Sequence, residues 1–112
     1  MKTTDALSAL AGLAQESRLA IFRLLVEQGP EGLPAGAIAD RLGLANATLS
    51  FHLKELTHAG LVSARQAGRF IYYRANYRTM NGLVAYLTEN CCGGNTCDIA
   101  CAPAPQPKRK AS

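Results

Sequence analysis

The chain has 112 residues, of which 48% are hydrophobic and 18% are charged. This length suits one domain, and the apolar share suffices for a buried core, which excludes a chain that is disordered throughout. No apolar run reaches the ~18 residues of a membrane span, and the N-terminus lacks the basic, apolar and small-residue order of a secretory signal. We therefore expect a cytoplasmic protein without a membrane partner.

The net charge of +4 is distributed unevenly along the chain. Residues 1–53 carry −1, residues 54–78 carry +4, residues 79–107 carry −2, and the tail residues 108–110 carry +3. A short basic stretch such as 54–78 is typical of a surface that binds a nucleic acid, although a solvated charged face is the ordinary alternative.

Hydrophobic periodicity predicts two helices near the N-terminus, over residues 5–14 and 16–28. Gly29-Pro30 ends the second helix, and residues 29–33 are expected to form a loop. The apolar stripes of the two helices are Leu7, Leu10 and Leu13 in the first, and Leu19, Phe22, Leu25 and Val26 in the second, widened by Ile21 and Leu24.

Two further helices with a very short turn between them are predicted next. Pro34 suits the first turn of a helix that runs to about Leu42, and Gly43 suits its C-terminal cap. A second helix then runs to about His58. Two short helices joined by a glycine turn of this length form the helix-turn-helix pattern.

A β-hairpin and a last helix complete the predicted order of elements. Residues 61–66 and 70–75 form the strands, and residues 77–90 form the helix. The fold class is therefore mainly α with a small β-hairpin, a winged helix-turn-helix. Residues 102–112 are proline-rich and basic, and we expect them to be disordered.

The second helix of the motif separates an apolar face from a polar face. On a helical wheel Leu49, Leu53 and Leu56 point inward, and His52 lies at their flank as a packed residue. The outward face is small, hydroxyl-bearing, aromatic and basic, which suits a DNA major groove, whereas an ordinary solvated helix surface is the alternative. The residues predicted to contact DNA are Asn46, Ala47, Thr48, Ser50, Phe51 and Lys54 in this helix, and Arg65 and Arg69 in the hairpin.

Several segments resemble the ArsR/SmtB family of metalloregulatory repressors, over roughly residues 5–90. The matching segments are SRLAIFRLL (17–25), ADRLGL (39–44), SFHLKEL (50–56), AGLV (59–62) and RQAGR (65–69), with Tyr72-Tyr73. The resemblance implies a homodimeric bacterial repressor of double-stranded operator DNA, with its first and last helices at the dimer interface. The implied interface residues are Leu7, Leu10, Met80, Leu83, Val84 and Leu87.

The sequence departs from the family pattern in three places. Ala45 stands where the family often has a serine or aspartate cap. Residues 33–39 lack the Cys-x-Cys motif of one arsenic-sensing branch, and residues 80–89 lack the histidines of the zinc, cobalt and nickel sensors. Neither of those effector sites can form in this sequence.

The four cysteines lie close together after the last predicted helix. Clustered thiols in a cytosolic chain suit a soft ion, and trivalent arsenic takes three sulfurs in a pyramid. Adjacent cysteines offer two sulfurs, and Gly93-Gly94 lets the chain fold back to bring a third. This cluster also resembles the arsenite site of a third branch of the family. The predicted ligands are Cys91 and Cys92 with Cys97 or Cys101.

The sequence therefore predicts a repressor that leaves its operator when trivalent arsenic binds these thiolates, with antimony or methylarsenite as alternative ligands and no organic cofactor. We expect a DNA-binding and dimerisation domain over residues 1–90, a metalloid-binding segment over 91–101, and a tail over 102–112. A zinc or cadmium site, a disulfide switch and inert cysteines remain open alternatives. No nucleophile–base pair or phosphate-binding glycine loop indicates an enzyme.

Overall fold

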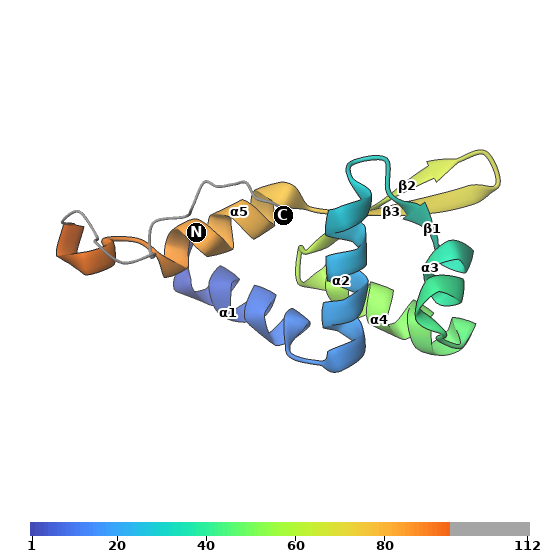
Figure 1. Cartoon of the computed structure of the whole chain (residues 1–112), viewed down its shortest axis with the longest axis horizontal. Helices are drawn as coiled ribbons and strands as arrows, with labels where there is room; N and C mark the ends of the chain where they lie inside the picture. The colour runs from blue at the N-terminus through green and yellow to red at the C-terminus, as the bar shows by residue number, and fades with distance from the viewer. Residues whose placement is uncertain (95–112) are drawn as a thin grey trace.

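The computed structural model describes residues 1–94, which form five α-helices, three β-strands and a short 3-10 turn (Figure 1). In chain order these are α1 (Thr3–Leu13), α2 (Glu16–Gln28), β1 (Leu33–Pro34), α3 (Ala35–Leu42), α4 (Asn46–His58), β2 (Val62–Ala67), β3 (Phe70–Ala75), α5 (Tyr77–Leu87) and η1 (Cys91–Gly94). The predicted tail and most of the predicted metalloid segment, with Cys97 and Cys101, lie outside the described residues.

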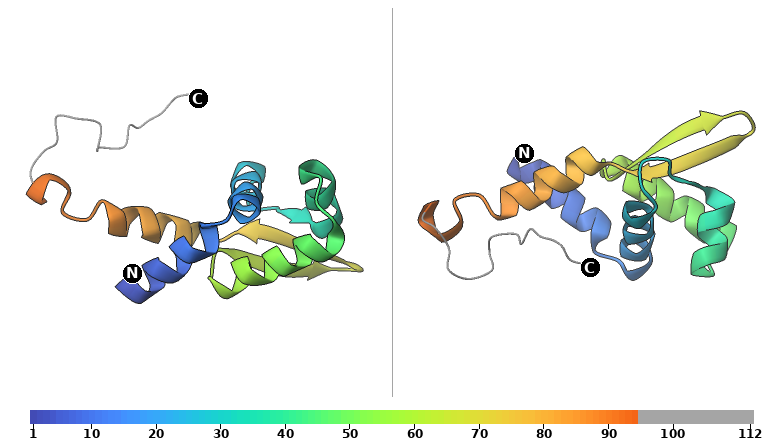
Figure 2. Two further views of the ribbon diagram at one scale, coloured as in Figure 1. Left: turned by 90° about the horizontal axis from the view of Figure 1, so that it is seen from below. Right: turned by 45° about the horizontal axis from the view of Figure 1, so that its top comes forward.

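Helices α1 and α5 pack together at one end of the molecule, and the β2–β3 hairpin projects from the other (Figure 1). In the left view of Figure 2, α4 and the hairpin lie along the lower side of the molecule, and α2 and α3 lie above them. The core between these elements is mainly aliphatic, and its largest fully buried side chains are Ile21, Leu25, Ile38, Leu49, Leu56 and Leu61. Within residues 1–94, no helix is long and apolar enough to cross a bilayer.

The helix-turn-helix turn forms as the sequence predicts. Gly43 adopts a left-handed φ of 65°, which glycine tolerates without steric cost. The next amide, that of Leu44, donates to the carbonyl of Ala39 at 3.1 Å and satisfies a group that the end of α3 leaves open. Ala45 precedes α4 and supplies no side-chain hydrogen bond, so the departure at this position leaves α4 without the usual cap.

The expected loop over residues 29–33 is partly wrong, because Leu33–Pro34 form strand β1. This strand pairs antiparallel with β3 through Leu33↔Tyr73 and Pro34↔Tyr72, which gives the sheet order β1-β3-β2. A two-residue strand is too short for hydrophobic alternation to reveal, and proline is tolerated at a sheet edge. Pro34 therefore precedes α3 and does not stand in its first turn.

Two further details differ from the sequence prediction. The apolar face of α2 is rotated, so that Leu19 is 44% exposed whereas Ile21 is fully buried. The last helix ends at Leu87, before the expected residue 90, and the hydroxyl of Thr88 donates back to the carbonyl of Val84 at 2.8 Å. Such local bonds compete with helix propagation and favour an end there. Neither change alters the element order, and the winged helix-turn-helix fold is confirmed.

Candidate nucleic-acid interface and cysteine site

The polar face of α4 lies open to solvent. Its inward leucines, Leu49, Leu53 and Leu56, are each at most 3% exposed, so the helix is fixed against the core and its opposite face points outward. The predicted residues on that outward face are all exposed, namely Asn46, Ala47, Thr48, Ser50, Phe51 and Lys54. Side chains on a rigid helix are positioned more accurately than side chains on a loop, which suits base reading.

His52 is packed at the flank of the core, as the helical wheel predicts. The side chain is 8% exposed, and among the described residues its Nδ1 atom has no hydrogen-bond partner. Its ring lies 5.6 Å from that of Phe51 in an edge-to-face arrangement. This contact orients an aromatic ring that is itself 56% exposed on the outward face of α4.

A groove of about 320 Å³ separates α4 from the hairpin. Ser50 and Lys54 line it from α4, and Ala64 and Tyr73 line it from paired positions on β2 and β3. A basic, hydroxyl-lined groove of this kind fits a phosphodiester strand. Tyr73 is a groove residue that the predicted DNA contacts do not include, although strand alternation places it and Tyr72 on opposite faces of the hairpin.

The predicted hairpin arginines lie in different environments. Arg69 is exposed in the turn next to Gly68, whose φ is 64°. Arg65 lies along the strand with its guanidinium carbon 5.4 Å from the centre of the Tyr72 ring. Because Arg65 pairs with Tyr72 while the neighbouring Ala64 lines the groove, Arg65 belongs to the face turned away from α4. Arg65 thus lies on the opposite face of the hairpin from α4, although the sequence predicts that it contacts DNA together with the α4 residues.

The first and last helices expose large apolar side chains. The exposed fractions are 60% for Leu7 and 39% for Leu10 on α1, and 56% for Val84 and 61% for Leu87 on α5. Met80 is half-buried, and Leu83 is only 7% exposed. Leu83 is thus a residue of the chain's own core rather than of an exposed face. The two helices are tied by a 2.6 Å hydrogen bond between the hydroxyls of Thr3 and Tyr86.

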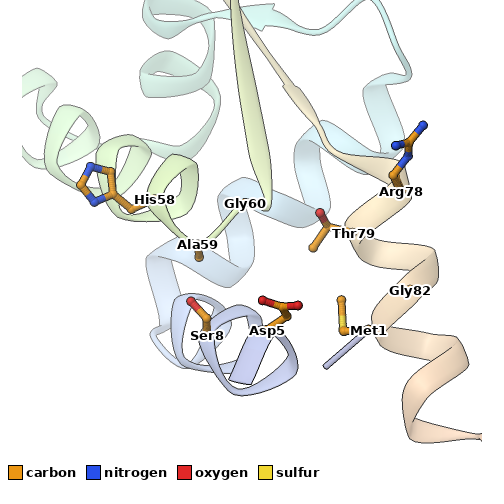
Figure 3. Close-up of a pocket in the computed structure, with 9 residues that line it drawn as sticks. All are labelled: Met1, Asp5, Ser8, His58, Ala59, Gly60, Arg78, Thr79 and Gly82. Carbon is orange, nitrogen blue, oxygen red and sulfur yellow. The ribbon is translucent and has the colours of Figure 1, made fainter. Parts of the chain in front are cut away.

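A cavity of about 490 Å³ lies where α1, the end of α4 and α5 meet (Figure 3). Asp5 and Ser8 line it from α1, His58 from the end of α4, and Thr79 from α5. Nearby, the packing of α1 on α4 is tight: a Cβ atom on Gly12 would lie 2.8 Å from the Cβ atom of Ala59. The end of α4 is therefore in direct contact with the helix that carries Leu7 and Leu10.

Two cysteines follow α5 closely within the described chain. The Sγ atoms of Cys91 and Cys92 lie 3.8 Å apart, and Asn90 and Cys92 both have a left-handed φ of 57°. Cys92 is disulfide-bonded. Residues 1–94 contain no group of three or more histidine, cysteine or carboxylate side chains placed to hold a metal ion. A site with three sulfurs therefore needs a ligand from outside this part of the chain.

Comparison with known proteins gives a consistent result. A family model for a helix-turn-helix domain matches residues 13–64. The HTH-type transcriptional regulator YceK of Bacillus subtilis is 40% identical over 60 residues, which is 54% of this chain and 59% of YceK. The nodulation protein NolR of Rhizobium meliloti is 37% identical over 80 residues, 71% of this chain and 63% of NolR. The chain thus spans less than two thirds of each of these relatives.

Solved structures match over more of the chain. An ArsR-like transcriptional regulator from Rhodococcus sp. RHA1 has a TM-score of 0.69 and 30% identity, covering 81% of this chain and 82% of that one. A possible transcriptional regulator for arsenical resistance has a TM-score of 0.62 and 30% identity, covering 71% and 80%. A homodimeric winged helix-turn-helix domain from Mycobacterium bovis has a TM-score of 0.63 and 28% identity, covering 86% and 89%. The chain therefore belongs to the ArsR-like family of helix-turn-helix transcriptional regulators.

Proposed function

We propose that this protein is a repressor that binds double-stranded operator DNA through α4 and the hairpin. The observation that carries the proposal is the continuity of the exposed polar face of α4 with the groove beside the hairpin. That surface offers hydroxyl and amide groups to base edges, and Lys54 and Arg69 to phosphates. The relatives are transcriptional regulators, which supports the same assignment.

We further propose that the protein acts as a homodimer through α1 and α5. The supporting observation is the set of exposed leucine and valine side chains on these two adjacent helices, since a monomer gains nothing by leaving them in water. The Mycobacterium bovis relative is homodimeric. A two-fold dimer presents two copies of α4 and suits an inverted repeat with half-sites ~34 Å apart.

The effector in this proposal is trivalent arsenic, bound by Cys91, Cys92 and either Cys97 or Cys101. The supporting observation is that the Sγ atoms of Cys91 and Cys92 lie 3.8 Å apart, which is close enough for both to reach one soft ion. Cys92 must be reduced before it can bind an ion. Antimonite needs the same three sulfurs and methylarsenite needs only two, so both belong in the same test.

The proposed signal runs through α1. Tyr86 in the last turn of α5 bonds to Thr3 in the first turn of α1, and Gly12 near the other end of α1 packs against Ala59 beside α4. An ion that changes the conformation of the chain after α5 therefore acts on α1 through the contact of α1 with α5. Helix α1 is in turn in contact with the end of α4. Coupling between such sites is typically ~1–3 kcal/mol, or roughly 5- to 150-fold in affinity.

The testing experiment measures binding of the reduced, full-length protein to its operator by fluorescence anisotropy, with and without arsenite. We expect arsenite to weaken binding by roughly 5- to 150-fold. Parallel titrations with antimonite, methylarsenite, zinc and cadmium identify the preferred ion. An operator affinity that arsenite leaves unchanged contradicts the metalloid proposal, whereas failure of the unliganded dimer to bind any operator contradicts the repressor proposal.

A redox-responsive repressor is the second candidate, because Cys92 is disulfide-bonded. A disulfide that closes and opens beside α5 can bias the same helices without an ion. Comparing operator affinity after peroxide and after reductant, in metal-free buffer and with free thiols counted in parallel, separates the two candidates. A change in affinity that follows thiol oxidation alone favours the redox switch.

A further inference from the structure

The hairpin has a second basic surface on the side away from α4. We define the outer basic face by its residues, which are Ser63, Arg65, Tyr72, Arg74 and Arg78. The pairs Ser63↔Arg74 and Arg65↔Tyr72 lie on one side of the sheet. Ala64 and Tyr73, which line the groove beside α4, lie on the other side because successive side chains of a strand alternate.

A cavity of about 450 Å³ lies at the base of this outer basic face. Its lining residues are Ser63, Arg74, Ala75, Asn76, Tyr77 and Arg78. No carboxylate is among these residues, whereas two of them are arginines. Arg78 also lines the cavity where α1, the end of α4 and α5 meet, and Figure 3 shows its guanidinium pointing away from Asp5. Two guanidinium groups beside a hydroxyl and an amide suit a phosphate.

Hydrogen bonds hold the base of this face in place. The hydroxyl of Tyr77 donates to the carbonyl of Val26 at 3.2 Å, which ties the start of α5 to α2. The side-chain amide of Asn76 donates to the carbonyl of Gly60 at 3.0 Å, which ties the same point to the end of α4. Nε of Arg74 lies 3.4 Å from the Ser63 hydroxyl and donates to it. A site fixed in this way loses little conformational freedom when it binds.

We propose that the outer basic face binds a phosphodiester strand of DNA distinct from the strand in the groove beside α4. This inference rests on the proposed function. The DNA minor groove is only ~6 Å wide, so a hairpin that enters it has a backbone strand on either side. The two faces of the hairpin then meet different strands, and both need positive charge.

The charge of the region matches this role. Residues 54–78 carry +4, and their only acidic residue, Glu55, belongs to α4 and not to the hairpin. Tyr72 holds the guanidinium of Arg65 over its ring, which restricts the side chain while its charge stays available. Because phosphate contacts carry no sequence information, the outer basic face raises affinity and widens the footprint without changing which operator is chosen.

The test is the salt dependence of operator binding by the full-length dimer carrying both Arg74→Gln and Arg78→Gln. Each lost phosphate contact lowers the slope of log K against log salt by ~0.9, so we expect a loss of about 1.8 per protomer. The ratio of operator to non-operator affinity stays unchanged. Arg74→Lys with Arg78→Lys keeps the charges and retains most of the slope, and Arg23→Gln on the exposed surface of α2 is the matched control.

Each possible result of these measurements either supports or overturns the inference about the outer basic face. A double variant with the slope of the unsubstituted protein overturns the inference while leaving the proposed function intact, since operator binding is still observed. A loss that differs between operator and non-operator DNA indicates a base contact and also overturns it. The inference also fails if inorganic phosphate at constant ionic strength binds the unsubstituted protein but not the variant while the DNA slopes agree, because the face then holds a free anion.

Discussion

Helix α4 and the cysteine segment after α5 are the two regions on which the proposed function depends, and they are held in opposite ways. Three leucines fix α4 against the core, and its outward residues are fixed with it. Cys91 and Cys92 follow the last helix in a segment where Asn90 and Cys92 have a left-handed backbone. Residues 1–94 contain no group of three side chains placed to hold a metal ion. The proposed reading surface is thus preformed, whereas the proposed sensing site is completed by the ion it binds.

Leu56→Ala tests the first half of this contrast and has the largest expected effect. Leu56 is fully buried on the inner face of α4, so truncation removes apolar contacts and leaves a cavity. We expect a loss of ~2–5 kcal/mol in unfolding free energy, measured by urea denaturation. Thr48→Ala on the exposed face is the control and stays within about 0.5 kcal/mol.

Cys91→Ser tests the second half. The variant loses a proposed sulfur ligand and leaves the core unchanged, so we expect the proposed response to arsenite, up to about 150-fold in operator affinity, to disappear. Operator affinity without arsenite and the unfolding midpoint remain those of the unsubstituted protein. A variant that still responds fully removes Cys91 from the proposed ligand set.

Arg69→Ala tests whether the hairpin turn belongs to the proposed DNA-binding surface. Arg69 is exposed at the hairpin turn, where a guanidinium contacts phosphates or a narrow groove. We expect weaker binding to all DNA sequences and a salt slope lower by ~0.9 per protomer, with the arsenite response preserved. An unchanged slope excludes the turn from the DNA surface.

Ala45→Ser has the smallest expected effect. Ala45 precedes α4 in an extended conformation and provides no cap, whereas a serine oxygen can accept a hydrogen bond from an amide of the first turn. We expect unfolding free energy to rise by about 1 kcal/mol. Ala45→Val, which also lacks a side-chain acceptor, is the matched variant, and equal stability of the serine and valine variants means that the serine side chain does not cap the helix.

Much of this architecture is readable from the sequence because local chemistry dictates it. Gly43 supplies the left-handed turn, and the leucine spacing of α4 fixes which residues point outward. The features that the sequence does not predict depend on contacts between residues that are far apart in the chain. Strand β1 exists only because Leu33 and Pro34 meet β3, and Arg65 could be assigned to the outer face only once its pairing with Tyr72 was known. The burial of Leu83 likewise depends on how α5 packs against the rest of the chain.

Strand β1 also affects how readily the protein aggregates through its sheet edges at high concentration. Pro34 lacks an amide hydrogen, so the side of the sheet that β1 covers is a poor template for another strand. The opposite border, β2, carries Arg65 and Gln66 on an exposed stretch, and a charged border also discourages strand addition. At high local concentration, the sheets of neighbouring molecules can therefore lie side by side without pairing into a continuous cross-β structure.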